Sequence, residues 1–134
     1  ILRRIRAMGV QTALDDFGTG YSSLSYLDSL PLNKVKVDRS FVRKVAVERR
    51  ARDLLHRLVG LCRTIGLEVV VEGVETEAQL DVIRETGEVA WVQGYHFSKP
   101  MKPQEVIPYM DSVTAETRRR RVAETGKRFK VVSG

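Results

Sequence analysis

The stretch Asp15-Asp16-Phe17-Gly18-Thr19-Gly20-Tyr21-Ser22-Ser23-Leu24 places two adjacent carboxylates where an apolar run passes into a glycine-containing loop. Residues 10–14 before it are rich in β-forming side chains and predict a strand with the acids at its carboxyl end. Neighbouring strand residues point to opposite faces, so the two acids converge only where the strand bends, and we expect Gly18 and Gly20 to supply that bend. The pair is suited to holding cations, although Asp-Asp before Gly is also ordinary turn chemistry.

The composition indicates one soluble domain with a modest core. The chain has 134 residues, of which 43% are hydrophobic and 30% charged. The single cysteine, Cys62, cannot form an intrachain disulfide, no apolar run approaches the length of a membrane span, and the first residues lack a signal-peptide core. We therefore expect a cytoplasmic globular domain. The missing initiator Met suggests that the chain is cut from something larger.

The net charge of +6 is not spread evenly along the chain. Residues 115–134 hold seven of the 23 basic and two of the 17 acidic residues, a net of +5, which leaves +1 for residues 1–114. We accordingly divide the chain into a domain at residues 1–113 and a basic C-terminal tail at residues 114–134. A run such as Arg118-Arg119-Arg120-Arg121 is more often a solvated helix face or a terminus than a nucleic-acid site, so nucleic acid is a disfavoured partner.

Hydrophobic periodicity predicts helices that alternate with strands. The expected helices cover residues 1–8, 23–29, 48–65 and 77–86 and a short segment from about residue 103, and the expected strands cover residues 10–14, 34–38, 67–71 and 89–92. We expect the apolar stripe of the third helix to consist of Ala51, Leu54, Leu55, Leu58, Cys62 and Ile65, and Met8 and Cys62 to lie in the core. This alternation predicts an α/β fold of parallel βα units with about four strands.

Oxygen-bearing side chains follow all four predicted strands. They are Asp15 and Asp16 after the first, Asp38 together with Lys36 on the second, Glu72 after the third and Gln93 after the fourth. The carboxyl ends of parallel strands meet at one edge of the sheet, where active sites form. Carboxylates suit Mg²⁺ or Mn²⁺, and a pair of such ions is the usual device for attack on a phosphodiester. These residues also fit an enolase-type site with a lysine base, and the residues alone do not choose.

Four motifs, in this order and spacing, closely resemble those of the EAL domain family. They are the acidic stretch quoted above, Val35-Lys36-Val37-Asp38-Arg39-Ser40-Phe41-Val42, Val71-Glu72-Gly73-Val74-Glu75-Thr76 and Gln93-Gly94-Tyr95-His96-Phe97-Ser98-Lys99-Pro100-Met101. The resemblance covers nearly all of residues 1–112. It implies a TIM-like barrel and a bacterial signalling enzyme, a cyclic-di-GMP phosphodiesterase that linearises its substrate to pGpG with Mg²⁺ or Mn²⁺.

The resemblance also implies a role for each site residue. Asp15 and Asp16 would be metal ligands, and Asp38 would lie beside them as a contact to metal-bound water or substrate. Lys36 would contact the attacking water or the scissile phosphate. Glu72 would be an essential carboxylate with a base role. Further out, Gln93 would contact the nucleotide, and Glu75 would brace the loop that follows Asp16.

The chain departs from the family in its length. A barrel of this type has eight strands and roughly 250 residues, whereas this sequence shows only the later four, so we expect the C-terminal half of the domain. The strands that carry the family's Glu-x-Leu signature, an Asn ligand and a further Glu ligand are absent. We therefore expect this chain alone to be a poor catalyst or inactive. The alternative is a non-catalytic module that binds cyclic-di-GMP or a protein. An open half-barrel also predicts homodimerisation or pairing with a missing N-terminal half.

Overall fold

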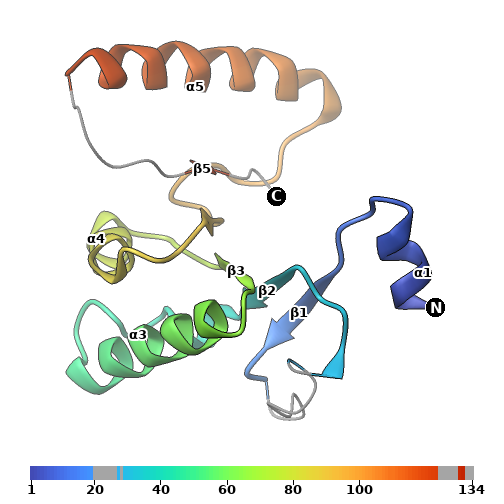
Figure 1. Cartoon of the computed structure of the whole chain (residues 1–134). Coiled ribbons are helices and arrows are strands. Elements are labelled where there is room, and N and C mark those ends of the chain that lie inside the picture. Colours follow the sequence, from blue (N-terminus) through green and yellow to red (C-terminus); the bar gives the residue numbers. More distant parts are fainter. Residues whose placement is uncertain (20–26, 28, 124–129, 132–134) are drawn as a thin grey trace.

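The structure is a computed structural model that describes residues 1–19, 27, 29–123 and 130–131. Helices and strands alternate along the chain, as Figure 1 shows. Their order is α1 (Leu2–Ala7), β1 (Ala13–Phe17), β2 (Lys34–Val37), the 3₁₀ turn η1 (Arg39–Phe41), α3 (Arg49–Thr64), β3 (Glu68–Val71), α4 (Glu77–Thr86), β4 (Trp91–Val92), α5 (Pro103–Ala123) and β5 (Lys130–Val131). The predicted helix at residues 23–29 falls mostly outside the described residues, although Leu27 is described and buried.

The strands form one parallel sheet in the order β1-β2-β3-β4-β5. Each strand lies beside the next one in the chain, and every pairing is parallel. Consecutive parallel strands require crossover connections, which α3 and α4 supply. The four predicted strands are therefore all present and the α/β fold class is confirmed.

β1 begins and ends three residues later than its prediction. Asp15 and Asp16 lie inside β1, because Phe17 beyond them is buried and pairs with Val37 of β2. The register shifts between Leu14 and Phe17, which marks a bulge. Asp16 itself has a left-handed backbone, with φ of 51°, a conformation that Asp tolerates better than most residues. The bend predicted at the glycines thus begins at Asp16, and Gly18 (φ 106°) continues it.

One face of the sheet packs against α3 and α4 to form the core. Alternate residues of β2, Val35 and Val37, are fully buried, as strand periodicity requires. Every residue of β3 after Glu68 is buried, as in a strand covered on both faces. The core cluster is Phe17, Leu27, Val35, Val37, Val42, Val45, Leu55, Val59, Cys62, Leu67, Val69, Val71, Val74, Leu80, Val82, Ile83, Val89 and Val92.

The buried stripe of α3 is narrower than predicted. Leu55, Val59 and Cys62 are buried, at the i, i+4, i+7 spacing of one helix face. Leu54 and Ile65, which were predicted to belong to the stripe, are substantially exposed. Leu54 precedes Leu55 by about 100° around the helix, so it points past the sheet rather than onto it.

α4 matches its prediction residue for residue. The Thr76 hydroxyl accepts a hydrogen bond from the Gln79 backbone N–H, and the Gln79 side chain accepts from the Thr76 backbone N–H. This reciprocal arrangement is a capping box. The helix ends at Gly87, whose φ of 68° is the left-handed conformation that closes helices.

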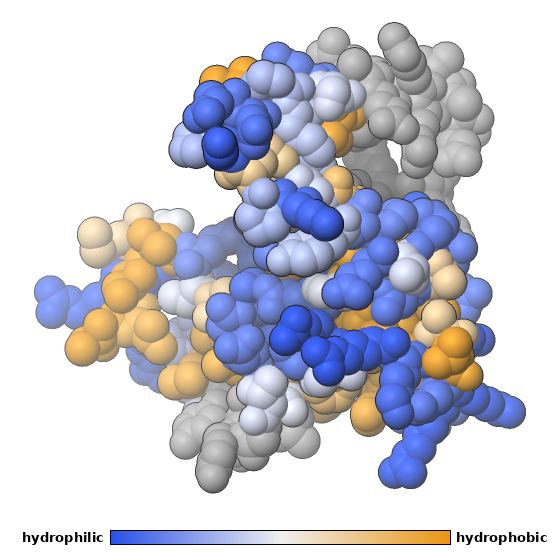
Figure 2. Space-filling view, turned by 180° about the vertical axis from the view of Figure 1, so that it is seen from behind, coloured by the Kyte–Doolittle hydropathy of each residue, from blue (hydrophilic) through white to orange (hydrophobic). Residues whose placement is uncertain are grey.

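The N-terminal segment projects away from the sheet (Figure 1). α1 has no buried residue, and Met8 is 79% exposed, so the prediction that Met8 belongs to the core is wrong. In Figure 2 apolar surface covers much of this projecting segment, to which Ile1, Met8 and Val10 contribute. The physical reason is that α1 lies away from the sheet, so its apolar side chains are not covered by the core.

The C-terminal part contains more regular structure than was predicted. α5 runs for 21 residues, across the boundary drawn at residues 113 and 114, and Pro108 lies within it. The helix lies apart from the sheet in Figure 1, and its Tyr109 hydroxyl donates to the Phe97 carbonyl at 3.0 Å. Beyond it, β5 pairs with β4 as a fifth strand that the sequence did not predict. Within the described residues, no helix has both the length and the apolar composition to span a membrane.

Candidate active site at the carboxyl edge of the sheet

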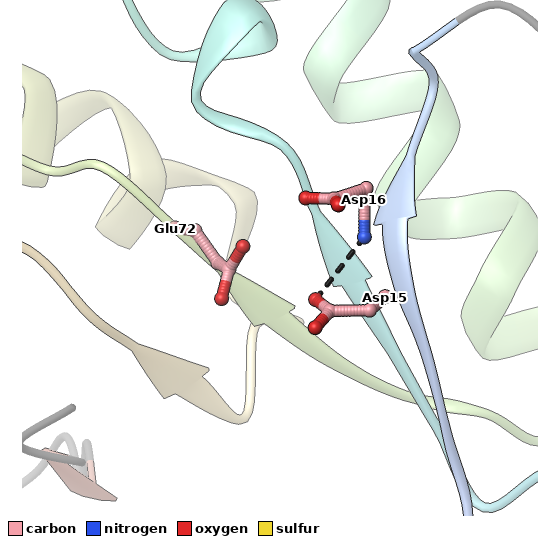
Figure 3. Close-up of side chains that lie close together, drawn as sticks. All are labelled: Asp15, Asp16 and Glu72. Atoms are coloured by element: carbon pink, nitrogen blue, oxygen red, sulfur yellow. Dashed lines mark hydrogen bonds between the residues drawn. The ribbon is translucent and has the colours of Figure 1, made fainter.

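β1 delivers two carboxylates to the edge of the sheet. The left-handed backbone at Asp16 places consecutive side chains near one another, and the Asp16 N–H donates to Oδ1 of Asp15 at 3.1 Å. Glu72 follows the last residue of β3 and points toward the same place, as Figure 3 shows. The bulge in β1 is therefore the local feature that lets neighbouring acids share one site.

Lys36 lies between the acids of two strands. Its ammonium group donates to Oδ1 of Asp15 at 2.9 Å and pairs with Oε1 of Glu72 at 2.5 Å. The Asp15 side chain is 63% exposed, whereas those of Lys36 and Glu72 are 27% and 17% exposed. The site thus has an open side at β1 and a more enclosed side at β3.

Hydrogen bonding fixes the charges of this group. The hydrogen bond from Lys36 holds the pKa of Asp15 below its ordinary value, and it outweighs the opposing effect of burial. Burial acts against the Lys36 ammonium, but the hydrogen bonds to Glu72 and Asp15 outweigh it and raise the pKa of this lysine. Lys36 is therefore a cation, and Asp15 an anion, throughout the neutral pH range.

The three carboxylates fit a hard divalent cation. Ligand oxygens of Asp15, Asp16 and Glu72 all lie within 4.8 Å of one another. In an octahedral Mg²⁺ site with ligands at about 2.1 Å, adjacent ligand oxygens lie about 3.0 Å apart and opposite ones about 4.2 Å apart, so side-chain rotations would have to draw these three oxygens closer together to bind one ion. An all-oxygen donor set is the chemistry that Mg²⁺ and Mn²⁺ prefer.

Asp38 does not join this group in the structure. Its side chain caps η1, where Oδ1 accepts a hydrogen bond from the Ser40 N–H at 2.9 Å. Hydrogen bonds from the Ser40 hydroxyl and backbone lower the pKa of Asp38. Of the predicted metal ligands, Asp15 and Asp16 come together among the described residues, and the third carboxylate beside them is Glu72, which was predicted as a base. A role for Asp38 stays a prediction.

Gln93 lies at the end of β4, beside the loop that carries Glu72. Its N–H donates to the Val71 carbonyl at 2.9 Å, and its carbonyl accepts from the Val74 N–H at 3.1 Å. The next residue, Gly94, lies against the backbone of Val74, so closely that a Cβ added to Gly94 would be 2.1 Å from the Val74 carbonyl oxygen. This contact places Gln93 one strand away from Glu72, while its predicted contact with nucleotide stays a prediction.

Glu75 is exposed just before α4, and its backbone N–H donates to the Gln79 side chain at 2.8 Å. The loop that it was predicted to brace falls mainly at residues 20–26, outside the described part of the chain. The bracing role of Glu75 therefore stays a prediction.

Sequence reasoning missed a second polar group on the same face of the sheet. Lys34 pairs with Glu68 at 3.3 Å, and the Trp91 indole N–H donates to Glu68 at 3.1 Å. The signal was present in the strand period, because Lys34 precedes Lys36 by two residues and Glu68 precedes Glu72 by four. Trp91 is half-buried in this group.

Comparisons with known proteins identify the family to which this chain is related. The EAL domain matches residues 1–100 of the chain. The cyclic di-GMP phosphodiesterase NbdA of Pseudomonas aeruginosa is 46% identical over 101 residues, which are 75% of this chain and 13% of NbdA. The cyclic di-GMP phosphodiesterase RocR of the same organism is 41% identical over 108 residues, 81% of this chain and 27% of RocR. The chain thus spans a small part of these relatives.

Solved EAL structures share the fold. The structure of an EAL domain protein from Listeria monocytogenes matches with a TM-score of 0.74 at 44% identity, over 84% of this chain and 44% of that one. The PaMucR phosphodiesterase, solved as a c-di-GMP complex, matches with a TM-score of 0.70 at 41% identity, over 78% and 42% of the two chains. The chain covers less than half of either structure. By its sequence match and its fold, it belongs to the EAL domain family.

Proposed function

We propose that this chain supplies the Asp15, Asp16, Lys36 and Glu72 part of a site that hydrolyses cyclic-di-GMP to pGpG. The observation that carries the proposal is the ammonium of Lys36 held between carboxylates of two strands. That arrangement is suited to a phosphodiester, whose reaction places negative charge on phosphate oxygens. The order of the motifs supports assignment of the chain to the C-terminal half of the domain.

The residues of this chain would take distinct parts in the reaction. Asp15, Asp16 and Glu72 would hold Mg²⁺ or Mn²⁺, which when bound supplies Lewis acidity and an activated water, two ions being the arrangement expected in the complete domain. Lys36 would turn its ammonium toward the phosphate and compensate the charge that develops there. Glu72, the most enclosed of the acids, would accept a proton. Gln93 would orient the nucleotide from β4, with Asp38 as a further contact to water or substrate and Glu75 as the brace of the loop after Asp16.

A chimera tests this function. Residues 1–100 would replace the stretch that they match in the EAL domain of PaMucR, and production of pGpG with Mn²⁺ would be measured by chromatography. We expect turnover, and we expect Lys36→Met and Glu72→Gln each to lower kcat on the order of 100-fold or more. Lys44→Met is the matched control, since Lys44 forms a lysine–glutamate pair with Glu48 on the surface, and it should leave kcat unchanged. Full activity of the Glu72→Gln chimera would refute the assignment.

A second candidate function follows from the length of the chain. Because it covers less than half of the solved EAL structures, it would supply only part of a ligand set. On that reading the chain binds cyclic-di-GMP, or another protein, without turnover. Calorimetry on the full chain with cyclic-di-GMP and Mn²⁺, run beside the pGpG assay, separates the two: binding without pGpG supports the second function. We expect the chain alone to yield little or no pGpG.

A further inference from the structure

The short turn η1 lies between the two strand ends that carry the site carboxylates. Its cap, Asp38, follows β2, and β2 pairs with β1 on one side and with β3 on the other. The Asp38 N–H donates to the Phe17 carbonyl at 3.3 Å, and the Glu72 N–H donates to the Val37 carbonyl at 3.1 Å. The backbone that leads into η1 is therefore hydrogen-bonded to the ends of both neighbouring strands.

Phe41, the last residue of η1, packs against the segment that follows β1. A Cβ added to Gly18 would meet three atoms of the Phe41 ring, the nearest at 1.9 Å, so the ring lies directly against the Gly18 backbone. Phe41 is half-buried and also packs against the core. Gly18 has a φ of 106°, a conformation that residues with a side chain rarely adopt. The sequence thus has a glycine where the ring leaves no space for a side chain.

Gly18 belongs to a turn that begins at Asp16. The Asp16 carbonyl accepts a hydrogen bond from the Thr19 N–H at 3.3 Å and another from the Thr19 hydroxyl at 2.9 Å. The left-handed backbone of Asp16, which sets the direction of its carboxylate, is part of the same turn. Contact of the Phe41 ring with Gly18 therefore restricts this turn, and with it the position of the Asp16 carboxylate.

The first residue of η1 makes the matching contact on the other side. A Cβ added to Gly73 would meet Cβ, Cα and Cγ of Arg39, and Gly73 directly follows Glu72. Arg39 and Phe41 belong to the same 3₁₀ turn. One short element therefore contacts both the residue after Glu72 and the turn that begins at Asp16, so it bears on the spacing of these two carboxylates.

We propose that Phe41 is a positioning residue: by packing against Gly18, it holds the Asp16 carboxylate beside that of Glu72 for a divalent cation. The inference rests on the proposed function in that it concerns the same carboxylates, which Figure 3 shows together with Asp15. Binding sites need their ligands placed to within about 0.5 Å, so small shifts of the turn at Asp16 should be felt in metal affinity. Phe41 touches neither metal nor substrate in this scheme and acts through Gly18.

Mn²⁺ affinity of the full chain, measured by electron paramagnetic resonance of the free ion, tests the proposal. Phe41→Leu keeps an apolar side chain against the core but removes the outer ring atoms, Cε2 and Cζ, that lie nearest to the Cβ position of Gly18. We expect Mn²⁺ to bind about three- to tenfold more weakly, because the turn that carries Asp16 gains freedom. Phe41→Met, whose longer side chain reaches the space of those atoms, should keep the Kd within about twofold of the wild-type value.

A double-mutant cycle with Gly18→Ala tests the contact itself. In the wild-type background the added Cβ overlaps the Phe41 ring, so Gly18→Ala should weaken Mn²⁺ binding about tenfold. In the Phe41→Ala background the same change should weaken binding by about threefold or less, since only the strain of the positive φ remains. That strain is common to both backgrounds and cancels in the comparison. Equal factors in the two backgrounds would overturn the proposal, as would an unchanged Kd in Phe41→Leu.

Ile83→Val separates positioning from a general loss of stability. Ile83 is fully buried in α4, and the site residues lie on other segments. Its truncation lowers stability by removing a buried methyl group, and it should leave the Mn²⁺ Kd within about twofold of the wild-type value. A loss of Mn²⁺ affinity equal to that of Phe41→Leu would show a general loosening of the fold and would overturn the proposal. Circular dichroism checks that each variant is folded.

The PaMucR chimera keeps this inference apart from the proposed function. Phe41→Leu should raise the Mn²⁺ concentration needed for half-maximal production of pGpG by about three- to tenfold, while saturating Mn²⁺ should restore most of kcat. If the Mn²⁺ cycle holds and no chimera makes pGpG, the hydrolase function fails and the positioning role stands. If the chimera is active and the cycle shows equal factors, the positioning role fails alone. Absence of Mn²⁺ binding from both the chain and the chimera overturns both.

Discussion

Gly73, the residue after Glu72, has no room for a side chain. Its φ is 71°, and an added Cβ would lie 2.3 Å from Cβ of Arg39. Gly87 has almost the same φ, 68°, but nothing lies within 4 Å of its added Cβ. We expect Gly73→Ala to lower the free energy of unfolding by about 2–5 kcal/mol, combining backbone strain with overpacking, and Gly87→Ala by about 1–2 kcal/mol. Urea denaturation measures both. Equal losses of unfolding free energy in the two variants would show that Arg39 moves aside at no energetic cost, which would contradict the expected overpacking.

Cys62 is fully buried, and burial raises the pKa of its thiol. Because the folded-state pKa lies above the unfolded one, this group stabilises the fold below about pH 9, and the contribution is lost as the pH rises through the folded value. At pH 8 we expect Ellman's reagent to modify the native thiol on the order of 100-fold more slowly than the urea-unfolded chain. Similar rates for both states would contradict burial of Cys62 in the core.

The positions that sequence reasoning missed were those whose environment depends on the tertiary structure. The Gly pattern suggested a bend after Asp16, but the bend starts at Asp16 itself, because buried Phe17 holds the strand beyond it. Met8 has the spacing of a core residue, yet nothing described covers it. Lys36 and Glu72 were recognisable because a motif fixes their place at strand ends, whereas the contact of Lys34 with Glu68 needed the register between two strands.

At the scale of elements, α4 depends on its capping box. Thr76→Ala removes the hydroxyl that accepts from the Gln79 N–H, and we expect a loss of about 1 kcal/mol in the free energy of unfolding. Thr64→Ala is the control, because the exposed Thr64 hydroxyl only donates back to the Gly60 carbonyl inside α3, and it should change stability by less than about 0.5 kcal/mol. Chemical denaturation measures the loss of unfolding free energy in both variants, and an unchanged m-value shows that only stability has changed. A larger loss at Thr64 would contradict the role given to the cap.

The helices and strands differ in how well sequence specified them. α4 carries its own start and stop signals, Thr76 and Gly87, and was predicted without error. β5 consists of only two residues, Lys130 and Val131, and it is a strand because it pairs with β4. No pattern in its own sequence predicts that pairing. α5 extends past its predicted apolar part because nothing in its sequence up to Ala123 breaks a helix once Pro108 is accommodated.

At the scale of the whole molecule, β1 is an edge strand of the sheet. Edge strands and exposed apolar surface favour association with another chain. We expect a second copy of this chain to associate in solution, seen as a concentration-dependent rise in sedimentation coefficient. Met8→Asp, on the segment leading into β1, should weaken this association, whereas Val47→Asp, in the turn before α3, should not. A monomer at all concentrations tested would contradict the expectation.

The close approach of Gly94 to Val74 joins the segment after β3 to the segment after β4. Val74 donates to the Gln93 carbonyl, and His96 donates back to the Val74 carbonyl at 2.9 Å. Both amides are held by hydrogen bonds between the two segments, so we expect their protons to be protected from exchange with deuterium. The segments that carry Glu72 and Gln93 are thus tied together by backbone contacts, and we expect a displacement of one segment to be transmitted to the other.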